Sequence, residues 1–131
     1  VACTGPLAGY AAYDSPSARG VTAELVSVLE PSFLLPFDNT EGCRVGVALV
    51  NPGKSEGESA ATSIVATIWD DDWRELGAEE LRLPANGHAS FMLEDKLPLT
   101  TGRRGVIEFR ADAGGSISGL ELRFEADADL W

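Results

Sequence analysis

The chain has 131 residues, a formal net charge of −11, 44% hydrophobic residues and 24% charged residues. This length suits a single domain over residues 1–131 with short terminal tails, and the composition argues against a wholly disordered chain. Phosphate binding needs clustered Lys and Arg, whereas the only basic pair is Arg103-Arg104, so the charge argues against nucleic-acid binding. We interpret the acidic excess mainly as a source of solubility.

The sequence offers no membrane-spanning segment, because no apolar run reaches the roughly 18 residues that such a helix needs. The chain begins at Val1, without Met and without a signal peptide, so we expect a processed or excised piece.

Cys3 and Cys43 are the only cysteines. In an acidic, Gly-rich β chain such a pair favours one disulfide, worth about 4 kcal/mol on the chain-entropy model. It would tie the N-terminus to the centre of the chain. The alternative is two buried free thiols in a cytosolic protein.

The first elements are two strands, a weak one over residues 7–13 and a longer one over residues 21–29. In the second, Val21, Ala23 and Leu25 form one apolar face. Val26 and Val28 then fall out of phase, which predicts a bulge or burial on both faces.

Residues 32–52 are the stretch around which we expect the others to pack. Two period-two alternations occupy it, with inward residues Phe33, Leu35 and Phe37 and then Val45, Val47 and Leu49. The segment DNTEG between them predicts a tight turn, so the two strands are expected to form a hairpin.

Five further strands are expected over residues 60–70, 73–83, 88–93, 106–111 and 117–125. Asn86-Gly87 predicts a hairpin turn, because Asn and Gly tolerate positive φ, and residues 94–105 form a longer connection. The expected inward residues are Ile64, Ala66, Ile68, Leu81, Leu83, Ala89, Phe91, Leu93, Ile107 and Phe109. In the last strand Leu120, Leu122 and Phe124 alternate with Glu121, Arg123 and Glu125.

These eight or nine short strands, with no segment at helical spacing, predict an all-β protein. The expected architecture is an antiparallel two-sheet sandwich of immunoglobulin-like shape. The buried Trp between two sheet-bridging Cys that marks antibody domains is missing from this sequence.

Three phrases carry a family resemblance: LPFDNTEGCRVGVALVNP at residues 35–52, LPANGHASFML at 83–93 and TTGRRGVIEFRADAGGSISGLELRF at 100–124. Together they resemble an uncharacterised immunoglobulin-like β-sandwich domain of large secreted proteins from soil bacteria such as acidobacteria, matched over residues 33–124. The resemblance implies an exported, non-catalytic module and transfers no functional residue. The family's turn usually reads D-x-x-G, whereas residues 70–73 read DDDW.

Trp69 and Trp73 flank a three-residue turn, a spacing that can place both rings on one face of adjacent strands. Paired rings of this kind can stack on sugars. The alternatives are rings that pack on the sandwich edge for stability and rings that contact another protein. Trp131 is a possible third ring.

Asp70, Asp71 and Asp72 offer hard oxygen ligands, so Asp70 and Asp72 are weak Ca²⁺ candidates that would need a partner such as Glu75. The alternative is a solvated turn, because three consecutive residues cannot all face one ion. We expect no bound cofactor and no structural metal.

The sequence predicts no enzyme. His88 is the sole histidine, no G-x-S-x-G motif is present, and small sandwiches rarely form the deep cleft that paired catalytic carboxylates need.

We therefore expect a secreted or cell-surface structural or interaction module of a bacterial protein, with a protein or a glycan as partner. The alternatives are a carbohydrate-binding module that uses Trp69 and Trp73, and a subunit that self-associates into an extracellular fibre or layer.

Overall fold

The computed structural model describes residues 10–15, 18–52 and 61–125, and the side chains from Leu29 onward within these ranges. The described residues contain nine strands, one helical turn and one 3-10 turn. The strands are β1 Tyr10–Ser15, β2 Ala18–Glu30, β3 Ser32–Asp38, β4 Arg44–Val50, β5 Thr62–Asp70, β6 Glu75–Leu83, β7 His88–Met92, β8 Arg104–Ala111 and β9 Ile117–Phe124. The helical segments α1 Leu93–Lys96 and η1 Pro98–Thr100 lie between β7 and β8.

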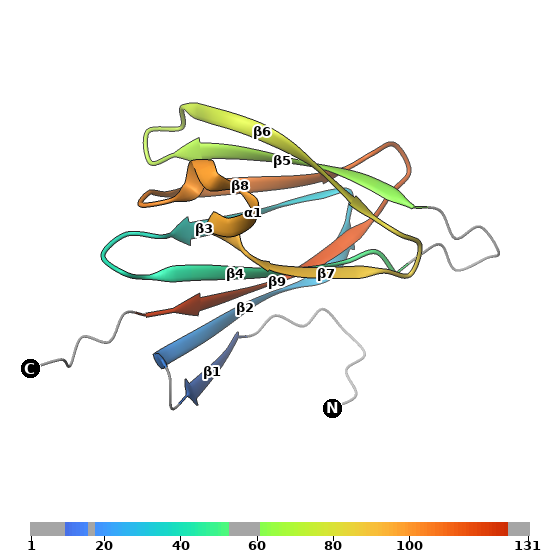
Figure 1. The fold of residues 1–131 in the computed structure, drawn as a ribbon. Coiled ribbons are helices and arrows are strands. Elements are labelled where there is room, and N and C mark those ends of the chain that lie inside the picture. The colour runs from blue at the N-terminus through green and yellow to red at the C-terminus, as the bar shows by residue number, and fades with distance from the viewer. Residues whose placement is uncertain (1–9, 16–17, 53–60, 126–131) are drawn as a thin grey trace, which may run out of the picture.

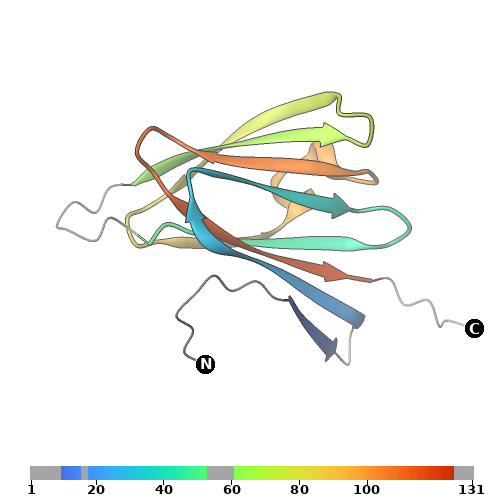
Figure 2. The same ribbon diagram turned by 180° about the vertical axis from the view of Figure 1, so that it is seen from behind.

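The strands form two antiparallel sheets. One has five strands in the order β1-β2-β9-β4-β7, and the other has four in the order β3-β8-β5-β6. Figures 1 and 2 show β5 and β6 at one side of the molecule and β1 and β2 at the other. The predicted all-β two-sheet sandwich is confirmed, as is the expected number of strands.

The core lies between the sheets and follows the predicted alternation. The buried side chains are Phe33, Leu35, Phe37, Val45, Val47, Leu49, Ile64, Ala66, Ile68, Leu81, Leu83, Leu93, Leu97, Ile107, Phe109, Ala111 and Ile117. The rings of Phe33 and Phe109 meet at a centroid distance of 5.6 Å in a tilted pair. Because the strands that supply these residues each turn one face inward, period two in the sequence becomes one continuous apolar layer.

The connection from β3 to β4 corrects the sequence interpretation. β3 pairs with β8 in the four-stranded sheet, whereas β4 pairs with β7 and β9 in the five-stranded sheet. The predicted hairpin is therefore wrong, and residues 39–43 instead carry the chain across the core (Figure 1). Any strand that packs on the core shows the same alternation of apolar and polar residues. The alternation is therefore the same whether two strands pair within one sheet or lie in opposite sheets, and it cannot tell a hairpin from a crossing.

Asn39 holds this crossing together from a buried position. Its Oδ1 accepts the Val45 backbone N–H at 2.9 Å, and its Nδ2 donates to both the carbonyl and the hydroxyl oxygen of Thr100 at 3.3 Å. Glu41 and Gly42 adopt positive φ within the same bend. Asn39 thus joins β4 to η1 where no sheet ladder can do so.

The turn at Asn86-Gly87 also joins the two sheets. Asn86 has a φ of 52°, as its sequence predicts, and the Gly87 N–H donates to the Pro84 carbonyl. However, β6 pairs with β5 and β7 pairs with β4, so the expected hairpin is again wrong. Asn51, at the end of β4, donates its Nδ2 to the Pro84 carbonyl at 3.1 Å and anchors the turn.

The long connection after β7 contains helical turns that complete the core. Leu93 in α1 and Leu97 beside it are fully buried, and Thr100 in η1 is buried next to Asn39. Figure 1 shows α1 between β6 of one sheet and β7 of the other. This segment therefore closes the side of the sandwich that lies between the edge strands β6 and β7.

In the five-stranded sheet, β2 and β9 can be compared with the faces that the sequence predicts for them. The β2–β9 register shifts between Val26 and Glu30, where the sequence predicts either a bulge or burial on both faces. In β9 the core-facing positions include Gly119, because a Cβ there would lie 2.5 Å from the Phe33 ring. Leu122 and Phe124 instead surround Gly46 on the opposite face, so the apolar side of β9 faces away from the core.

Candidate functional site

The two tryptophans that the sequence singles out lie close in the chain but in different settings. Trp69 belongs to β5, half-buried on the outer face of the four-stranded sheet, where its register partners are Val106 in β8 and Glu75 in β6. Trp73 lies in the turn before β6. The possibility that the two rings lie opposite each other on adjacent strands is therefore wrong, because Trp69 pairs with Glu75 and Trp73 lies before β6 begins.

The side chain of Asp70 builds the turn that carries Trp73. Its Oδ1 accepts the backbone N–H of Asp72 at 2.8 Å and that of Arg74 at 2.9 Å. The Trp73 N–H donates to the Asp70 carbonyl at 3.1 Å, which closes the turn. The segment DDDW is thus an Asx-type turn, in which the first Asp replaces backbone hydrogen bonds that the strands no longer provide.

Trp73 is held in a backbone conformation that tryptophan rarely adopts. Its φ is 59°, in the left-handed region, and 63% of the residue is exposed. A large side chain in this region costs about 1 to 2 kcal/mol, and an exposed ring regains little of that cost by burial. The turn therefore displays an indole ring to solvent at a cost in stability.

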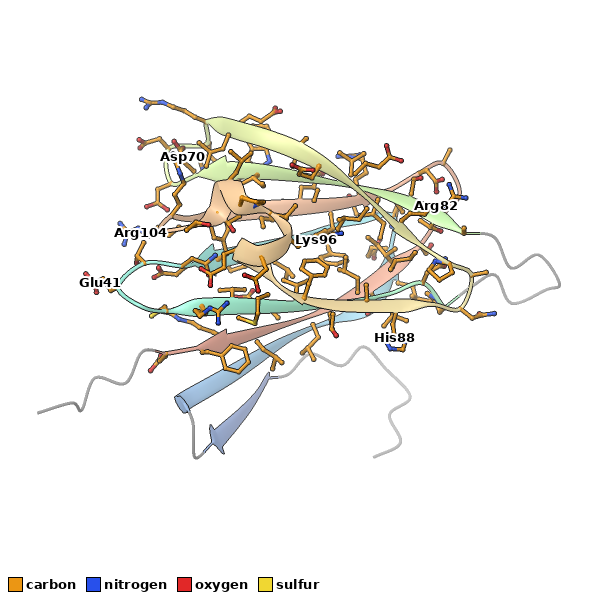
Figure 3. All side chains as sticks on the ribbon, in the orientation of Figure 1. Glu41, Asp70, Arg82, His88, Lys96 and Arg104 are labelled. Atoms are coloured by element: carbon orange, nitrogen blue, oxygen red, sulfur yellow. The ribbon has the colours of Figure 1, made fainter. Side chains whose placement is uncertain are left out.

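The ring borders an open hollow of about 360 Å³ at one end of the four-stranded sheet. We call this the Trp73 hollow. Pro36 and Val106 lie side by side in the β3–β8 register, and Trp69 continues their row in β5. Charged residues complete the lining, namely Asp38, Asp70, Asp71 and Arg104. Figure 3 shows Asp70 and Arg104 at the same end of the molecule.

An ion pair crosses the Trp73 hollow. Arg104 Nε lies 2.5 Å from Asp71 Oδ2, and this carboxylate raises the pKa of the guanidinium. Both side chains are more than half exposed, so the pair adds little to stability. Its donors and acceptors remain accessible to a polar ligand.

Asp38 supplies a second, more organised carboxylate. Its Oδ1 accepts the Thr40 hydroxyl at 2.5 Å and the Thr40 N–H at 3.0 Å, and its Oδ2 lies 3.5 Å from Arg123 Nη2. The hydrogen bond from the Thr40 side chain is the main cause that lowers the pKa of Asp38 below 3.8, and Arg123 adds to it. Asp38 therefore remains a charged acceptor in mildly acidic solution.

We expect the Asp38 carboxylate to contribute up to about 1 kcal/mol of pH-dependent stability. Because its folded-state pKa is lowered, that contribution is fully present above about pH 4 and is lost as the pH falls through the folded-state pKa. The gap in unfolding free energy between wild type and Asp38→Asn should shrink from pH 6 to about pH 2 in urea titrations. A gap that grows with acidification would contradict this.

The calcium candidates do not form a cluster. Asp70 uses Oδ1 to accept two backbone N–H groups, Asp71 pairs with Arg104, and Asp72 points to solvent as an exposed residue. Within the described residues no three His, Cys, Asp or Glu side chains are grouped as metal ligands. The carboxylates of this turn thus serve its backbone and Arg104.

Cys43 is half-buried after the sheet crossing, with its Sγ 3.9 Å from Arg123 Nη2. It makes no disulfide with a described residue. Cys3 lies outside the described residues, as does Trp131, so the disulfide and the third ring stay predictions.

Several residues of the Trp73 hollow escaped the sequence interpretation. Asp38, Arg104 and Val106 meet the turn that carries Trp73 because β3, β8 and β5 are neighbours in a fixed register. Pro36 was an available signal, since a proline within a strand indicates a sheet edge, which is where β3 lies.

Comparison with known proteins adds no family assignment. No model of a protein family matches the chain, and no curated protein matches it either. Among the described residues, no helix has the length and apolar character to cross a membrane.

Proposed function

We propose that this chain is a non-catalytic interaction module of a secreted or cell-surface bacterial protein, and that it contacts its partner through the Trp73 hollow. The observation that carries the proposal is Trp73 itself. An indole that is 63% exposed on a strained backbone is costly, and strain of this kind persists mainly where a surface is used. Aromatic anchors of this type dominate the energetics of binding surfaces.

The residues around the Trp73 ring support the binding of a partner rather than catalysis. The hollow is open, and its apolar row beside an exposed ion pair resembles a contact surface with a polar rim. The Oδ1 of Asp70 accepts two backbone hydrogen bonds of the turn, so this oxygen has a structural role. The location outside the cell is proposed from the domain resemblance and the predicted disulfide.

A glycan is the partner class that the composition of the hollow favours. One exposed ring can stack on the apolar face of a sugar, while the Arg104–Asp71 pair and Asp38 offer donors and acceptors for hydroxyl groups. An extended saccharide could lie along Pro36 and Val106, which continue from the ring towards the edge of the sheet. A protein surface with an apolar side chain and a polar rim is the other partner.

The replacement Trp73→Asn separates function from stability. Asn accepts positive φ, so the variant should unfold with a free energy equal to wild type or higher by about 0.5 to 1 kcal/mol. It should lose at least tenfold in affinity for any glycan that an array or polysaccharide pull-down identifies. Denaturant titration and isothermal calorimetry measure the two effects.

Leu29→Asn is the matched control, because Leu29 is also an exposed apolar residue but lies at the end of β2. It should bind as wild type does. A Trp73→Asn variant that keeps full affinity would reject the Trp73 hollow as the binding surface. A glycan that is recovered cleaved after incubation would reject the non-catalytic assignment.

A further inference from the structure

A cavity of about 220 Å³ lies between β6 and β7, each of which is the edge strand of its sheet. We call it the edge cleft. Its apolar lining comes from both sheets and consists of Leu49, Leu81, Leu83, Ala89 and Phe91. The three leucines are buried core residues, and Ala89 and Phe91 pack against the core partly buried. The edge cleft is therefore an opening towards the core between two strand edges.

The hydrogen-bonding pattern of β7 shows which of its backbone groups face this opening. Asn51 lies opposite Gly87 in the β4–β7 register, and its N–H donates to the Gly87 carbonyl at 2.9 Å. Bonded and non-bonded pairs alternate along an antiparallel ladder, so Ala89 and Phe91 bond to β4. Ser90, which lies between them, therefore directs both its N–H and its C=O away from β4, to the open edge of the sheet.

Of the two edge strands beside the cleft, β7 is the better site for a further strand. β6 carries the exposed charged residues Glu79, Glu80 and Arg82, and charges on an edge strand oppose pairing with another chain. β7 reads HASFM, contains no Asp, Glu, Lys or Arg, and exposes Ser90 at its centre. Its unpaired backbone groups are therefore open to an extended chain.

Lys96 gives the edge cleft a cationic end. It belongs to α1, which follows β7, and it lines the cavity. Figure 3 shows Lys96 on α1 and His88 at the other end of β7. The neighbouring carboxylates are directed elsewhere, because Glu94 forms an ion pair with Arg44 and Asp95 Oδ2 lies 3.6 Å from Arg44 Nη2. Lys96 forms no ion pair with any residue that the structure describes, so it can attract an acidic group of a partner.

We propose that the edge cleft binds an extended peptide segment of a partner protein, which adds to β7 as a further strand of the five-stranded sheet. In strand addition the main chain supplies hydrogen bonds, here to Ser90, and alternate side chains enter pockets. Partner residues opposite Ala89 and Phe91 face the cleft, so the segment carries two apolar residues two positions apart. The cavity exceeds the roughly 150 Å³ that accommodates benzene, which gives room for branched aliphatic side chains.

The segment also carries an acidic residue at its end beside α1, where Lys96 lies. This site is independent of the function proposed for the Trp73 hollow.

The probe is the peptide acetyl-EVTLT-amide, titrated into the full chain by calorimetry and amide NMR. Its Val and Leu are two residues apart, and its Glu lies at the α1 end when the peptide runs antiparallel to β7. We expect saturable binding in which the central Thr pairs with Ser90. Methylation of the central Thr nitrogen removes the donor to the Ser90 carbonyl and should weaken binding at least tenfold. Methylation of the Leu nitrogen, which points away from β7, is the matched control and should change binding less than twofold.

Hydrogen exchange reports the pairing of β7 directly. The Ser90 amide should exchange rapidly in the free chain and become protected when the peptide binds. The amides of Ala89 and Phe91, which bond to β4, should be protected in both states.

Variants of the chain test the same contact from the other side. Ser90→Pro lacks the edge N–H and should weaken peptide binding at least tenfold, yet keep a melting temperature close to wild type, because that N–H is not part of the ladder. Ser90→Thr keeps the N–H and should bind as wild type does. Trp73→Asn should also bind the peptide as wild type does, which separates this site from the proposed function.

The proposal is overturned if the wild-type chain shows no saturable binding of acetyl-EVTLT-amide. It is also overturned if the two methylated peptides bind equally well, or if two copies of the chain pair through β7 and thereby exclude the peptide.

Discussion

Replacing Gly105 with alanine is expected to lower the free energy of unfolding by about 3 kcal/mol. Gly105 lies in β8 between Phe37 of β3 and Asp70 of β5. A Cβ at this position would lie 1.9 Å from the Trp69 carbonyl oxygen and 3.1 Å from the Asp70 Cα. Both atoms belong to the backbone of β5, so relief requires that strand to move away from β8.

Urea titration of Gly105→Ala measures this loss. Gly102→Asn is the control, in the connection just before β8, since nothing lies within 4 Å of a Cβ there and Asn tolerates its φ of +64°. That variant should stay within about 1 kcal/mol of wild type. If Gly105→Ala proves as stable as Gly102→Asn, then β5 and β8 do not approach as closely as the structure shows.

Replacing Asn39 with alanine is expected to cost a similar amount, about 3 kcal/mol. The variant would leave the Val45 N–H without its Oδ1 acceptor and would remove both donors to Thr100. A buried polar group that loses its partner costs about 1 to 3 kcal/mol. Asn39 is buried, so water cannot readily substitute for its amide.

Hydrogen exchange gives this prediction a local readout. The Val45 amide should lose protection in Asn39→Ala more than other β4 amides do. Thr100→Val removes one acceptor of the Asn39 amide and the donor to Leu97 and should cost about 1 kcal/mol. An Asn39→Ala variant no less stable than Thr100→Val would show that the crossing from β3 to β4 does not depend on Asn39.

The core could be predicted from the sequence because it depends on a local rule. Alternate residues of a strand face opposite sides whichever strand lies beside it, so Phe33, Val45, Ile64 and Ile107 were assigned inward correctly. Partner choice is not local. The two wrong hairpins, at residues 39–43 and at Asn86-Gly87, both join strands that turn apolar faces to each other across the core.

The candidate site was predictable only in part, for a related reason. The sequence marks Trp73 and the three aspartates before it, but it does not show that β6 begins only at Glu75, so that Trp69 pairs with Glu75 and Trp73 stays in the turn. Asp38 and Arg104 reach the same end of the sheet through pairing between β3 and β8. Their meeting depends on long-range registers that alternation does not encode.

The position of β9 has a consequence for how the chain folds. β9 is the last of the strands that the structure describes, yet it lies inside its sheet between β2 and β4. Until it is synthesised, β2 and β4 lack the strand that joins them, and both expose unpaired edges. Assembly therefore waits for contacts between distant parts of the chain, which places this domain among slow folders, on the order of milliseconds to seconds. A nascent chain that stalls before Ile117 would be prone to aggregate through those edges.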